Sequence, residues 1–298
     1  MPSFTIIGGM LKQEMIIHLS GIPPVSHDDM MSHVERAREL ALPNIAGSPD
    51  TYPPDNGRKL AVVGGGPSIN EHVDKLKEWP GDIWTINGTY HWARARGIRS
   101  TFIAADPHSI VADWAKHVTD AIVITRCHPK VFEVLKANNA TIKTFEIDGV
   151  SRTITGTSTA TAAVHLAWLS GYRNLTFFGC ESCYLPGASH AFMHEKRDAE
   201  VIVQVGDEQF FTAPDYLCQA IELSGIIRAM KVKEESGGLL RALIANPKYR
   251  FIWISQGMFD NMKEHHLEQV KTEFGKQLGE ELRKRGHSMV ISAKSQAA

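Results

Sequence analysis

The chain has 298 residues, of which 43% are hydrophobic and 22% are charged. This balance is typical of a globular protein that can bury a large core, and it excludes disordered and fibrous proteins. The 32 basic and 33 acidic residues leave a formal net charge of −1, which provides no general attraction for nucleic acid or for an anionic membrane.

The sequence also indicates where the protein works. No stretch approaches the roughly 18 consecutive apolar residues that a membrane span needs, so we expect no span. The four cysteines are too few to cross-link a chain of this size, and the N-terminus lacks the pattern of a secretory leader. These features predict a cytoplasmic protein.

The N-terminal region, residues 1–46, is expected to be a helical extension. Apolar residues recur at helical spacing over residues 30–42, and Ser26 or Asp28 precedes them as a candidate N-cap. Residues 47–57 hold three prolines among turn-forming residues, which neither a helix nor a central strand tolerates. We interpret this second stretch as a linker.

The main domain is expected over residues 58–235. Short runs rich in β-branched and aromatic residues alternate there with helical patterns of crossover length, which is typical of strands covered by helices on both faces. The six runs are LAVVGGG, DIWTING, STFIAADP, AIVITRC, TIKTFEI and NLTFFGCE. Six such units predict an α/β fold with a Rossmann-like, doubly wound and mostly parallel sheet.

The pattern changes after the sixth run. Residues 200–212 are expected to form a β-hairpin that turns at Gly206 and Asp207, and residues 213–229 a long amphipathic helix. Residues 250–255 have the pattern of one more strand, and residues 258–285 that of a polar, charged helix. The segment 236–298 is therefore expected to pack on the main domain or to extend it.

The ligands of open α/β sheets bind beyond the carboxyl ends of the strands, so the loops there are the candidate sites. The first loop holds Gly64, Gly65, Gly66, Pro67 and Ser68 between a strand and a helix. Glycines let the backbone approach a phosphate, and a helix N-terminus offers free N–H groups to it. The alternative is a tight turn that needs glycine for steric reasons alone.

This loop argues against two well-known classes of nucleotide site. The dinucleotide fingerprint needs a third glycine where Ile69 stands and an acidic residue at the end of the second strand, where the sequence reads Ile86, Asn87 and Gly88. The Walker pattern, in which Lys and then Ser or Thr follow the glycines, is also absent from the sequence. The chain is therefore not expected to be a dehydrogenase.

Two further strand ends supply polar side chains. Asn87 and Gly88 follow the second strand, where the amide suits a base edge or a ribose hydroxyl, and where an ordinary Asn-Gly turn is the alternative. Asp106 ends the third strand. Its carboxylate could hold Mg²⁺ against phosphate oxygens, or it could cap the next helix.

A fourth group lies around the sixth strand. Gly156, Thr157 and Ser158 open an apolar helix with donors for a phosphate or a sugar hydroxyl, or they serve only as a helix cap. Glu181 ends the strand itself. We expect it to face the same crevice as Asp106 and to be the second Mg²⁺ ligand.

Cysteines and histidines follow that strand. Cys180, Cys183, His190 and His194 have a spacing near that of a zinc site, but the central gap is short and Cys180 ends an apolar strand, so we expect no structural zinc. His190 or His194 is better suited as a general base or as a phosphate-contacting cation. A surface histidine without a role is the alternative for each.

Four segments, in this order, resemble the 6-hydroxymethylpterin diphosphokinase MptE-like family: GGGPSI, INGTYHWARARGIRSTFIAADP, TGTSTATAAVHLAWLSGYRNLTFFGCE and SHAFMH. That family is similar to bacterial CMP-sialic acid sialyltransferases and to the motility accessory factors, and the resemblance covers about residues 60–242. It implies a site in which residues 64–68 meet the nucleotide phosphates, lined also by Asn87, Asp106, Thr157 and Ser158. Two features depart from the family, because Glu181 stands where many relatives carry Asp and residues 1–45 have no counterpart.

The resemblance implies one of two reactions. In the diphosphokinases, ATP with Mg²⁺ gives its terminal diphosphate to a pterin hydroxymethyl group, and in the sialyltransferases an acceptor hydroxyl attacks a CMP-sugar with a histidine as base. The leading hypothesis is a nucleotide-dependent transferase of the first type, with Asp106 and Glu181 on Mg²⁺ and His190 or His194 activating the acceptor. The alternatives are a CMP-sugar glycosyltransferase and a non-catalytic nucleotide-binding protein. The expected partners are the nucleotide and a small acceptor, and a homo-oligomer is left open.

Overall fold

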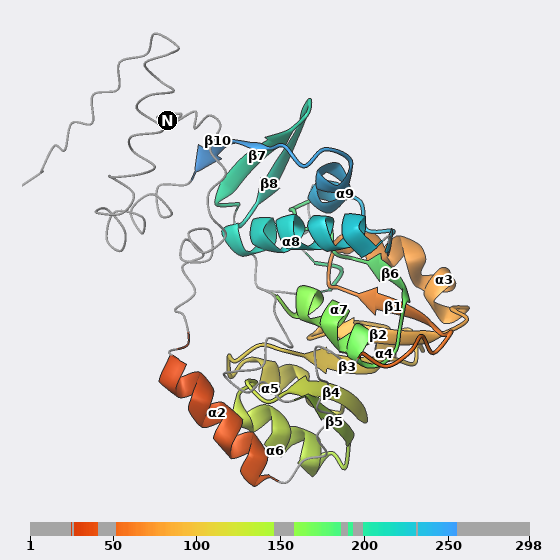
Figure 1. Ribbon diagram of the computed structural model, residues 1–298, viewed down its shortest axis with the longest axis vertical. Helices are drawn as coiled ribbons and strands as arrows, with labels where there is room; N and C mark the ends of the chain where they lie inside the picture. Colours follow the sequence, from red (N-terminus) through yellow and green to blue (C-terminus); the bar gives the residue numbers. More distant parts are fainter. Residues whose placement is uncertain are drawn as a thin grey trace, which may run out of the picture.

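A seven-stranded parallel sheet forms the centre of the protein (Figure 1). The structure is a computed structural model that describes residues 25, 27–40, 52–145, 158–185, 190–192, 199–230 and 232–254. The strand order is β5-β4-β3-β2-β1-β6-β9, and every neighbouring pair runs parallel. The strands are β1 Lys59–Val63, β2 Asp82–Ile86, β3 Thr101–Ala104, β4 Asp120–Ile124, β5 Thr141–Phe145, β6 Asn174–Phe178 and β9 Lys233–Glu234.

The chain winds outward from β1 in both directions. The strand order runs from β1 to β5 on one side and continues with β6 on the other, so the winding reverses between β1 and β6. This confirms the doubly wound α/β fold that the alternating runs predict. In such sheets the switch point leaves a crevice at the carboxyl ends of the strands, and ligands bind there.

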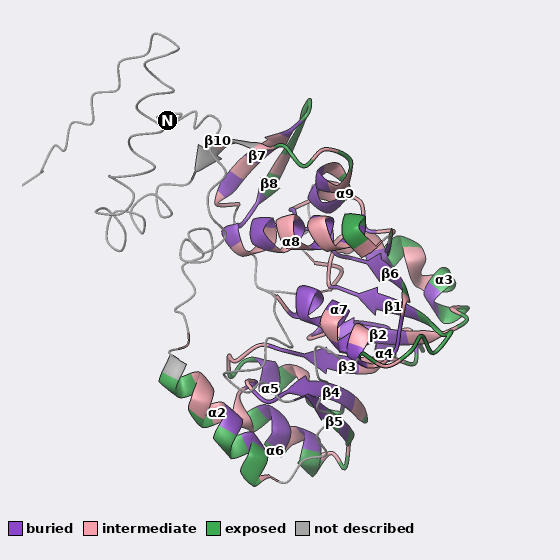
Figure 2. Ribbon diagram, in the orientation of Figure 1, coloured by how far each residue is buried: buried purple, intermediate pink, exposed green. Residues whose placement is uncertain are grey.

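Helices cover both faces of this sheet, because its strands are apolar on both sides. One face carries Ala61 and Val63 under η1, α3 and α4, and the opposite face carries Leu60 and Val62 under α7, with α8 beside α7. Figure 2 shows the central strands as buried. The helices are α2 His27–Glu39, η1 Pro67–His72, α3 Val73–Lys77, α4 Thr89–Ala95, α5 Val111–Trp114, α6 Pro129–Ala137 and α7 Thr159–Leu169.

A second, three-stranded antiparallel sheet adjoins the first. The hairpin of β7 Val201–Val205 and β8 Glu208–Thr212 turns at the predicted residues 206 and 207, and β10 Arg250–Ile254 pairs with the other edge of β7. Helices α8 Pro214–Met230 and α9 Gly238–Ala245 cover it (Figure 1). Helix α8 therefore lies between the small sheet and α7, where it can reach the carboxyl edge of the main sheet.

Several predicted elements differ in detail. Helix α2 packs on α6 but begins at His27, which places Asp28 in its first turn and not at its N-cap, and Ser26 lies outside the described residues. The single helix expected after the glycine loop is a 3₁₀ helix followed by a short α-helix. The predicted C-terminal helix, residues 258–285, lies outside the described residues. Of the helices that are described, none has the length and apolar character needed to cross a bilayer.

Candidate functional site

A pocket with a volume of about 170 Å³ opens where β1 and β6 end, at the switch point of the main sheet. Residues after three strands line it, together with side chains from α5, from α8 and from the segment 190–192. They include Gly64, Gly65, Gly66, Asn87, Gly88, Trp114, Cys180, Glu181, Ser182, His190, Phe192, Tyr216 and Gln219. The fold therefore brings the glycine loop, the Asn-Gly turn, Glu181 and His190 together.

The glycine loop packs directly against the end of β6. The backbone N–H of Gly64 donates to Phe178 O at 2.8 Å, and that of Gly66 donates to Gly179 O at 2.8 Å. A Cβ atom at Gly64 would lie 2.5 Å from Gly179 O, which no side chain tolerates. The close approach of the two backbones therefore explains part of the reason why glycine is needed in this loop. Two of the three glycine N–H groups already donate hydrogen bonds within the chain.

A carboxylate of the protein already occupies the start of the helix after this loop. Glu181 Oε1 accepts a hydrogen bond from the backbone N–H of Ser68 at 2.6 Å. A Cβ atom at Gly66 would overlap the other oxygen, Glu181 Oε2. The helix is a six-residue 3₁₀ helix with Pro67 in its first turn. The position that the sequence suggests for a phosphate is therefore held by Glu181, which leaves the Gly65 side of the loop for a ligand.

Three buried polar atoms around the pocket lack hydrogen-bond partners in the described structure. They are Ser68 Oγ, Asn87 Oδ1 and Glu181 Oε2. Glu181 is only 1% exposed, and burial raises the pKa of its carboxyl, although the nearby Ser68 hydroxyl and the Ser68 N–H oppose that shift. Buried polar atoms are nearly always paired in native proteins, so each exception needs an explanation. Asn87 Oδ1 and Glu181 Oε2 are acceptors that a water, or the N–H or O–H groups of a ligand, can satisfy.

The backbone at two of these strand ends has an unusual conformation. Asn87 has φ 49° and Ser182 has φ 56°, both in the left-handed region that non-glycine residues rarely adopt. Ser182 is held there because Gln219 Nε2 donates to its Oγ at 3.0 Å and Thr212 Oγ1 donates to its backbone oxygen at 2.8 Å. Such conformations cluster at ligand sites, where the surroundings fix them.

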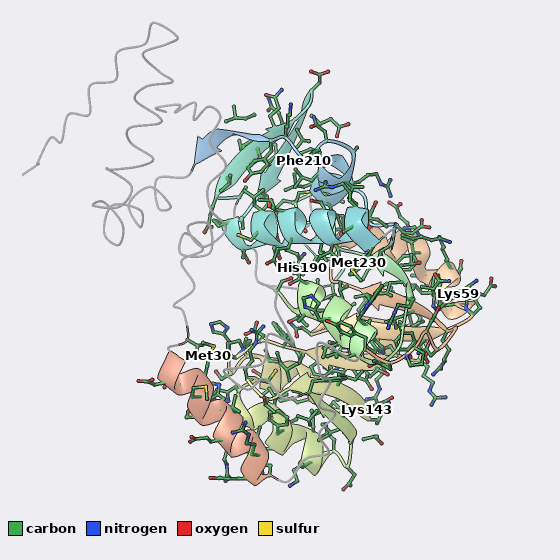
Figure 3. All side chains as sticks on the ribbon, in the orientation of Figure 1. Met30, Lys59, Lys143, His190, Phe210 and Met230 are labelled. Atoms are coloured by element: carbon green, nitrogen blue, oxygen red, sulfur yellow. The ribbon has the colours of Figure 1, made fainter. Side chains whose placement is uncertain are left out.

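His190 and Phe192 cover the glycine loop. The N–H of Ala191 donates to Gly65 O at 2.9 Å, which ties this segment to the loop. A Cβ atom at Gly65 would lie 3.1 Å from the His190 ring and 3.3 Å from the Phe192 ring. The Tyr216 hydroxyl lies 3.2 Å from His190 Nε2, so α8 orients the imidazole, which Figure 3 labels beside that helix.

The other predicted site residues lie in different surroundings. Asp106 Oδ1 accepts hydrogen bonds from the backbone N–H of His108 at 2.9 Å and from its Nδ1 at 2.6 Å, and Asp106 does not line the pocket. Ser158 is the N-cap of α7 in a capping box with Thr161, while Pro67 begins η1. Gly156, Thr157 and His194 lie outside the described residues.

The pocket does not bring the two proposed Mg²⁺ ligands together. Glu181 Oε2 is a carboxylate oxygen with no other partner in the described chain, whereas Asp106 is engaged by its own turn. No group of three His, Cys, Asp or Glu side chains in the described parts is placed to hold a metal ion. Mg²⁺ bound to a nucleotide commonly uses one or two carboxylates together with phosphate oxygens. Of the two proposed ligands, Glu181 lines the pocket and Asp106 does not.

The two cysteines whose spacing is near that of a zinc site, for which we expect no zinc, are buried free thiols. Cys180 and Cys183 both line the pocket but are buried, and burial raises the pKa of Cys183 to about 11 and that of Cys180 further. The backbone N–H of Cys180 donates to Ser236 Oγ at 2.9 Å. Both side chains therefore have the environment of structural cysteines, which are inert at neutral pH.

Four residues that line the pocket do not follow a strand of the main sheet, so the rule that ligands bind beyond strand ends does not select them. Trp114 and Phe192 contribute aromatic walls, and Tyr216 and Gln219 come from one face of α8. Their spacing of three residues on a helix that starts at a proline is the only sequence signal for this pair. That signal does not say which helix face meets the sheet edge, so the sequence could not identify them.

A parallel, doubly wound sheet with a glycine-lined pocket at its switch point defines a Rossmann-like α/β protein. More particularly, the chain belongs to the 6-hydroxymethylpterin diphosphokinase MptE-like family, whose model matches residues 34–187. No curated protein matches the sequence.

Of the solved structures that match, the first one below shows the same fold. The MAf glycosyltransferase from Magnetospirillum magneticum AMB-1 is similar with a TM-score of 0.52 and 15% identity over 80% of this chain, which spans 44% of that protein's length. A mammalian sialyltransferase matches with a TM-score of 0.36 and 10% identity, over 78% of this chain and 90% of that one. The sialyltransferase CstII from Campylobacter jejuni has a TM-score of 0.27 and 12% identity, over 69% and 97% respectively.

Proposed function

We propose that the protein is a nucleotide-dependent transferase, and that the reaction its pocket supports best is glycosyl transfer from a nucleotide sugar to an acceptor hydroxyl. The observation that carries this proposal is the pair of buried, unpartnered acceptors, Asn87 Oδ1 and Glu181 Oε2, in a pocket at the switch point of the sheet. Ribose hydroxyls and the amino group of a base are donors that would satisfy both acceptors.

The same geometry suggests where the phosphate would lie. The Gly64 and Gly66 amides donate within the chain and Glu181 accepts from the Ser68 amide, so among the described residues of the loop the Gly65 amide is left for a ligand. His190 lies against Gly65 and can contact a phosphate oxygen or accept a proton. A nucleotide with its nucleoside toward Glu181 and its phosphate toward His190 would use both groups.

In this reaction the acceptor oxygen forms a bond to the anomeric carbon while the bond from that carbon to the nucleotide phosphate breaks. The acceptor proton passes to the His190 imidazole, and the phosphate leaves with the bonding electrons. The negative charge that develops on the leaving phosphate would be stabilised by the Gly65 amide and by a protonated His190. Tyr216, which contacts Nε2, would hold the ring in place.

Diphosphate transfer from ATP is the second candidate, because the family description names a diphosphokinase. Glu181 Oε2 would then be the carboxylate ligand of a Mg²⁺ ion, which would neutralise the phosphate charge. The position of Asp106 outside the pocket supports glycosyl transfer over this alternative, since a nucleoside monophosphate leaving group needs less help from a metal.

A product assay separates the candidates. Purified protein is incubated with CMP-, UDP- or GDP-sugars, and in parallel with ATP and 6-hydroxymethylpterin, each with Mg²⁺ or with EDTA, and released nucleotide is quantified. We expect nucleotide release from one sugar donor that persists in EDTA and falls at least about a hundredfold in His190→Ala. AMP formation that requires Mg²⁺ would instead support diphosphate transfer.

A matched variant controls for folding, and binding controls for the non-catalytic alternative. His165→Ala changes a histidine on the pocket-bordering helix α7 that does not line the pocket, and it should retain activity. Saturable nucleotide binding in calorimetry without turnover of any donor would overturn the transferase proposal and leave a nucleotide-binding protein.

A further inference from the structure

A second cavity, with a volume of about 320 Å³, lies on the main sheet away from the candidate site. It is bounded by the amino-terminal part of β1, by β6 and β9, and by the end of α3 with the turn that follows. Lys59, which lines this cavity, lies well away from His190 in Figure 3, where both are labelled. The site inferred here is independent of the proposed transferase function.

The sheet register explains why polar side chains meet at this cavity. Lys59 pairs with Asn174, and Thr176 pairs with Lys233, so all four side chains lie on one face. This is the face that α3 covers through Ala61 and its neighbours. Helix α3 ends at Lys77, and Pro80 turns the chain away, so none of the described helices lies above the amino-terminal edge of the face.

One buried hydrogen-bond donor and two exposed lysine ammonium groups belong to the cavity lining. Trp79 Nε1 is buried without a partner in the described structure. Neither the Lys59 nor the Lys233 ammonium lies within 4.0 Å of a described carboxylate. Trp79 lies in the turn after α3, Lys59 begins β1 and Lys233 begins β9. The tertiary fold, and not one lysine-rich segment, therefore brings these donors to the same cavity.

The remaining charged groups make the cavity selective for a small ligand. Lys75 Nζ is held by Glu235 Oε1 at 2.7 Å and lies over the Phe178 ring at 5.5 Å from its centroid. Glu78 adds a carboxylate to the lining. The lining therefore holds three lysines and two carboxylates, and its net charge is +1. This charge matches a ligand with one negative charge and is too small to attract a polyanion such as nucleic acid.

We propose that this cavity binds a compact oxyanion, namely the phosphate or carboxylate group of a small molecule. Lys59 and Lys233 supply the charge, and the Trp79 N–H supplies a directed neutral donor. An oxyanion can accept from all three at once, because it has several acceptor oxygens. Burying the indole N–H without an acceptor is unfavourable, and a bound oxyanion removes that penalty.

The Trp79 indole offers a direct test by NMR. The chain has six tryptophans, so a ¹H–¹⁵N spectrum of the uniformly labelled protein contains few indole signals, and Trp79→Phe identifies the one from this cavity. Inorganic phosphate, acetate and chloride are titrated separately at equal ionic strength. We expect a saturable shift of the Trp79 signal with phosphate or acetate, and which of the two binds tighter separates a phosphate ligand from a carboxylate ligand.

Variants provide the decisive comparison. Lys59→Met and Lys233→Met should each weaken the apparent affinity by about tenfold, since each removes a charge-assisted hydrogen bond. Lys77→Met on α3 lies outside the cavity lining and should leave the affinity unchanged. The proposal is overturned if no anion gives a saturable shift, if Lys77→Met weakens binding equally, or if the Trp114 signal of the candidate site responds instead of that of Trp79.

Discussion

Replacing Glu181 by glutamine should stabilise the protein at alkaline pH and weaken its binding of nucleotide. Glu181 is 1% exposed, its Oε1 accepts from the Ser68 N–H at 2.6 Å, and its Oε2 has no described partner. Glutamine keeps the size and the accepting oxygen but removes the charge. It also places an amide nitrogen where Oε2 now presents an acceptor to the pocket.

The sign of the stability effect follows from the pKa. Burial raises the pKa of Glu181 above its ordinary value of 4.5, so the folded state retains a proton that the unfolded chain has already lost. The stabilising contribution of this carboxyl is therefore fully present below pH 4.5 and is lost as the pH rises through the raised folded pKa. Above that pH, the wild type carries a buried charge that costs about 1–3 kcal/mol, and Glu181→Gln should recover this amount.

Urea unfolding followed by circular dichroism, at pH 4.5 and pH 8, measures the difference. Glu181→Gln should exceed the wild type in free energy of unfolding at the higher pH and approach it at the lower one. Glu235→Gln is the matched control, because the hydrogen bond from Lys75 lowers the pKa of Glu235 and the substitution should not stabilise the protein at pH 8. A Glu181→Gln variant that is less stable than the wild type by the same amount at both pH values would refute the reasoning.

Three other substitutions probe the site. Gly66→Ala should lower the free energy of unfolding in urea by about 1–3 kcal/mol, because its Cβ atom would overlap the Glu181 carboxylate beside the loop. Gly225→Ala is the control: it lies in helix α8, where a Cβ atom would meet nothing within 4 Å, and it should raise the free energy of unfolding by up to about 1 kcal/mol. Tyr216→Phe removes the hydroxyl 3.2 Å from His190 and should lower kcat about five- to tenfold with a smaller change in KM. Asp106→Asn should change nucleotide release by less than about tenfold in steady-state assays, since this carboxylate is engaged by its own turn, and a hundredfold loss would favour metal-assisted transfer.

The sequence predicts the main sheet well because its signal is local. Six apolar runs joined by crossover helices must be buried on both faces, and few folds other than a doubly wound parallel sheet bury them in this way. The sequence does not predict strand β9, because the strand has only two residues, Lys233 and Glu234, and both are polar. These residues form a strand only by pairing with Thr176 and Phe177. A strand that depends on a partner this distant in sequence has no local pattern.

The candidate site is only partly predictable for a related reason. The rule that ligands bind beyond the strand ends selects Gly65, Asn87 and Glu181, and the structure places all three around one pocket. The same rule selects Asp106, whose side chain bonds to the backbone and ring of His108 two residues later. Short-range bonds of this kind compete with a ligand, and sequence alone does not show which wins.

Glu181 changes how the glycine loop is understood. A glycine-rich turn before a helix suggests an empty anion site, yet here the protein's own carboxylate accepts the Ser68 amide and fills the space beside Gly66. The loop is thereby organised before any ligand arrives, which lowers the conformational cost of binding. A phosphate placed at the same amide would meet this carboxylate at close range, so the two cannot share the position without protonation or a cation between them. The phosphate position beside Gly65 and His190 avoids that repulsion, and it leaves the unpartnered Glu181 oxygen for a hydrogen-bond donor of the nucleoside.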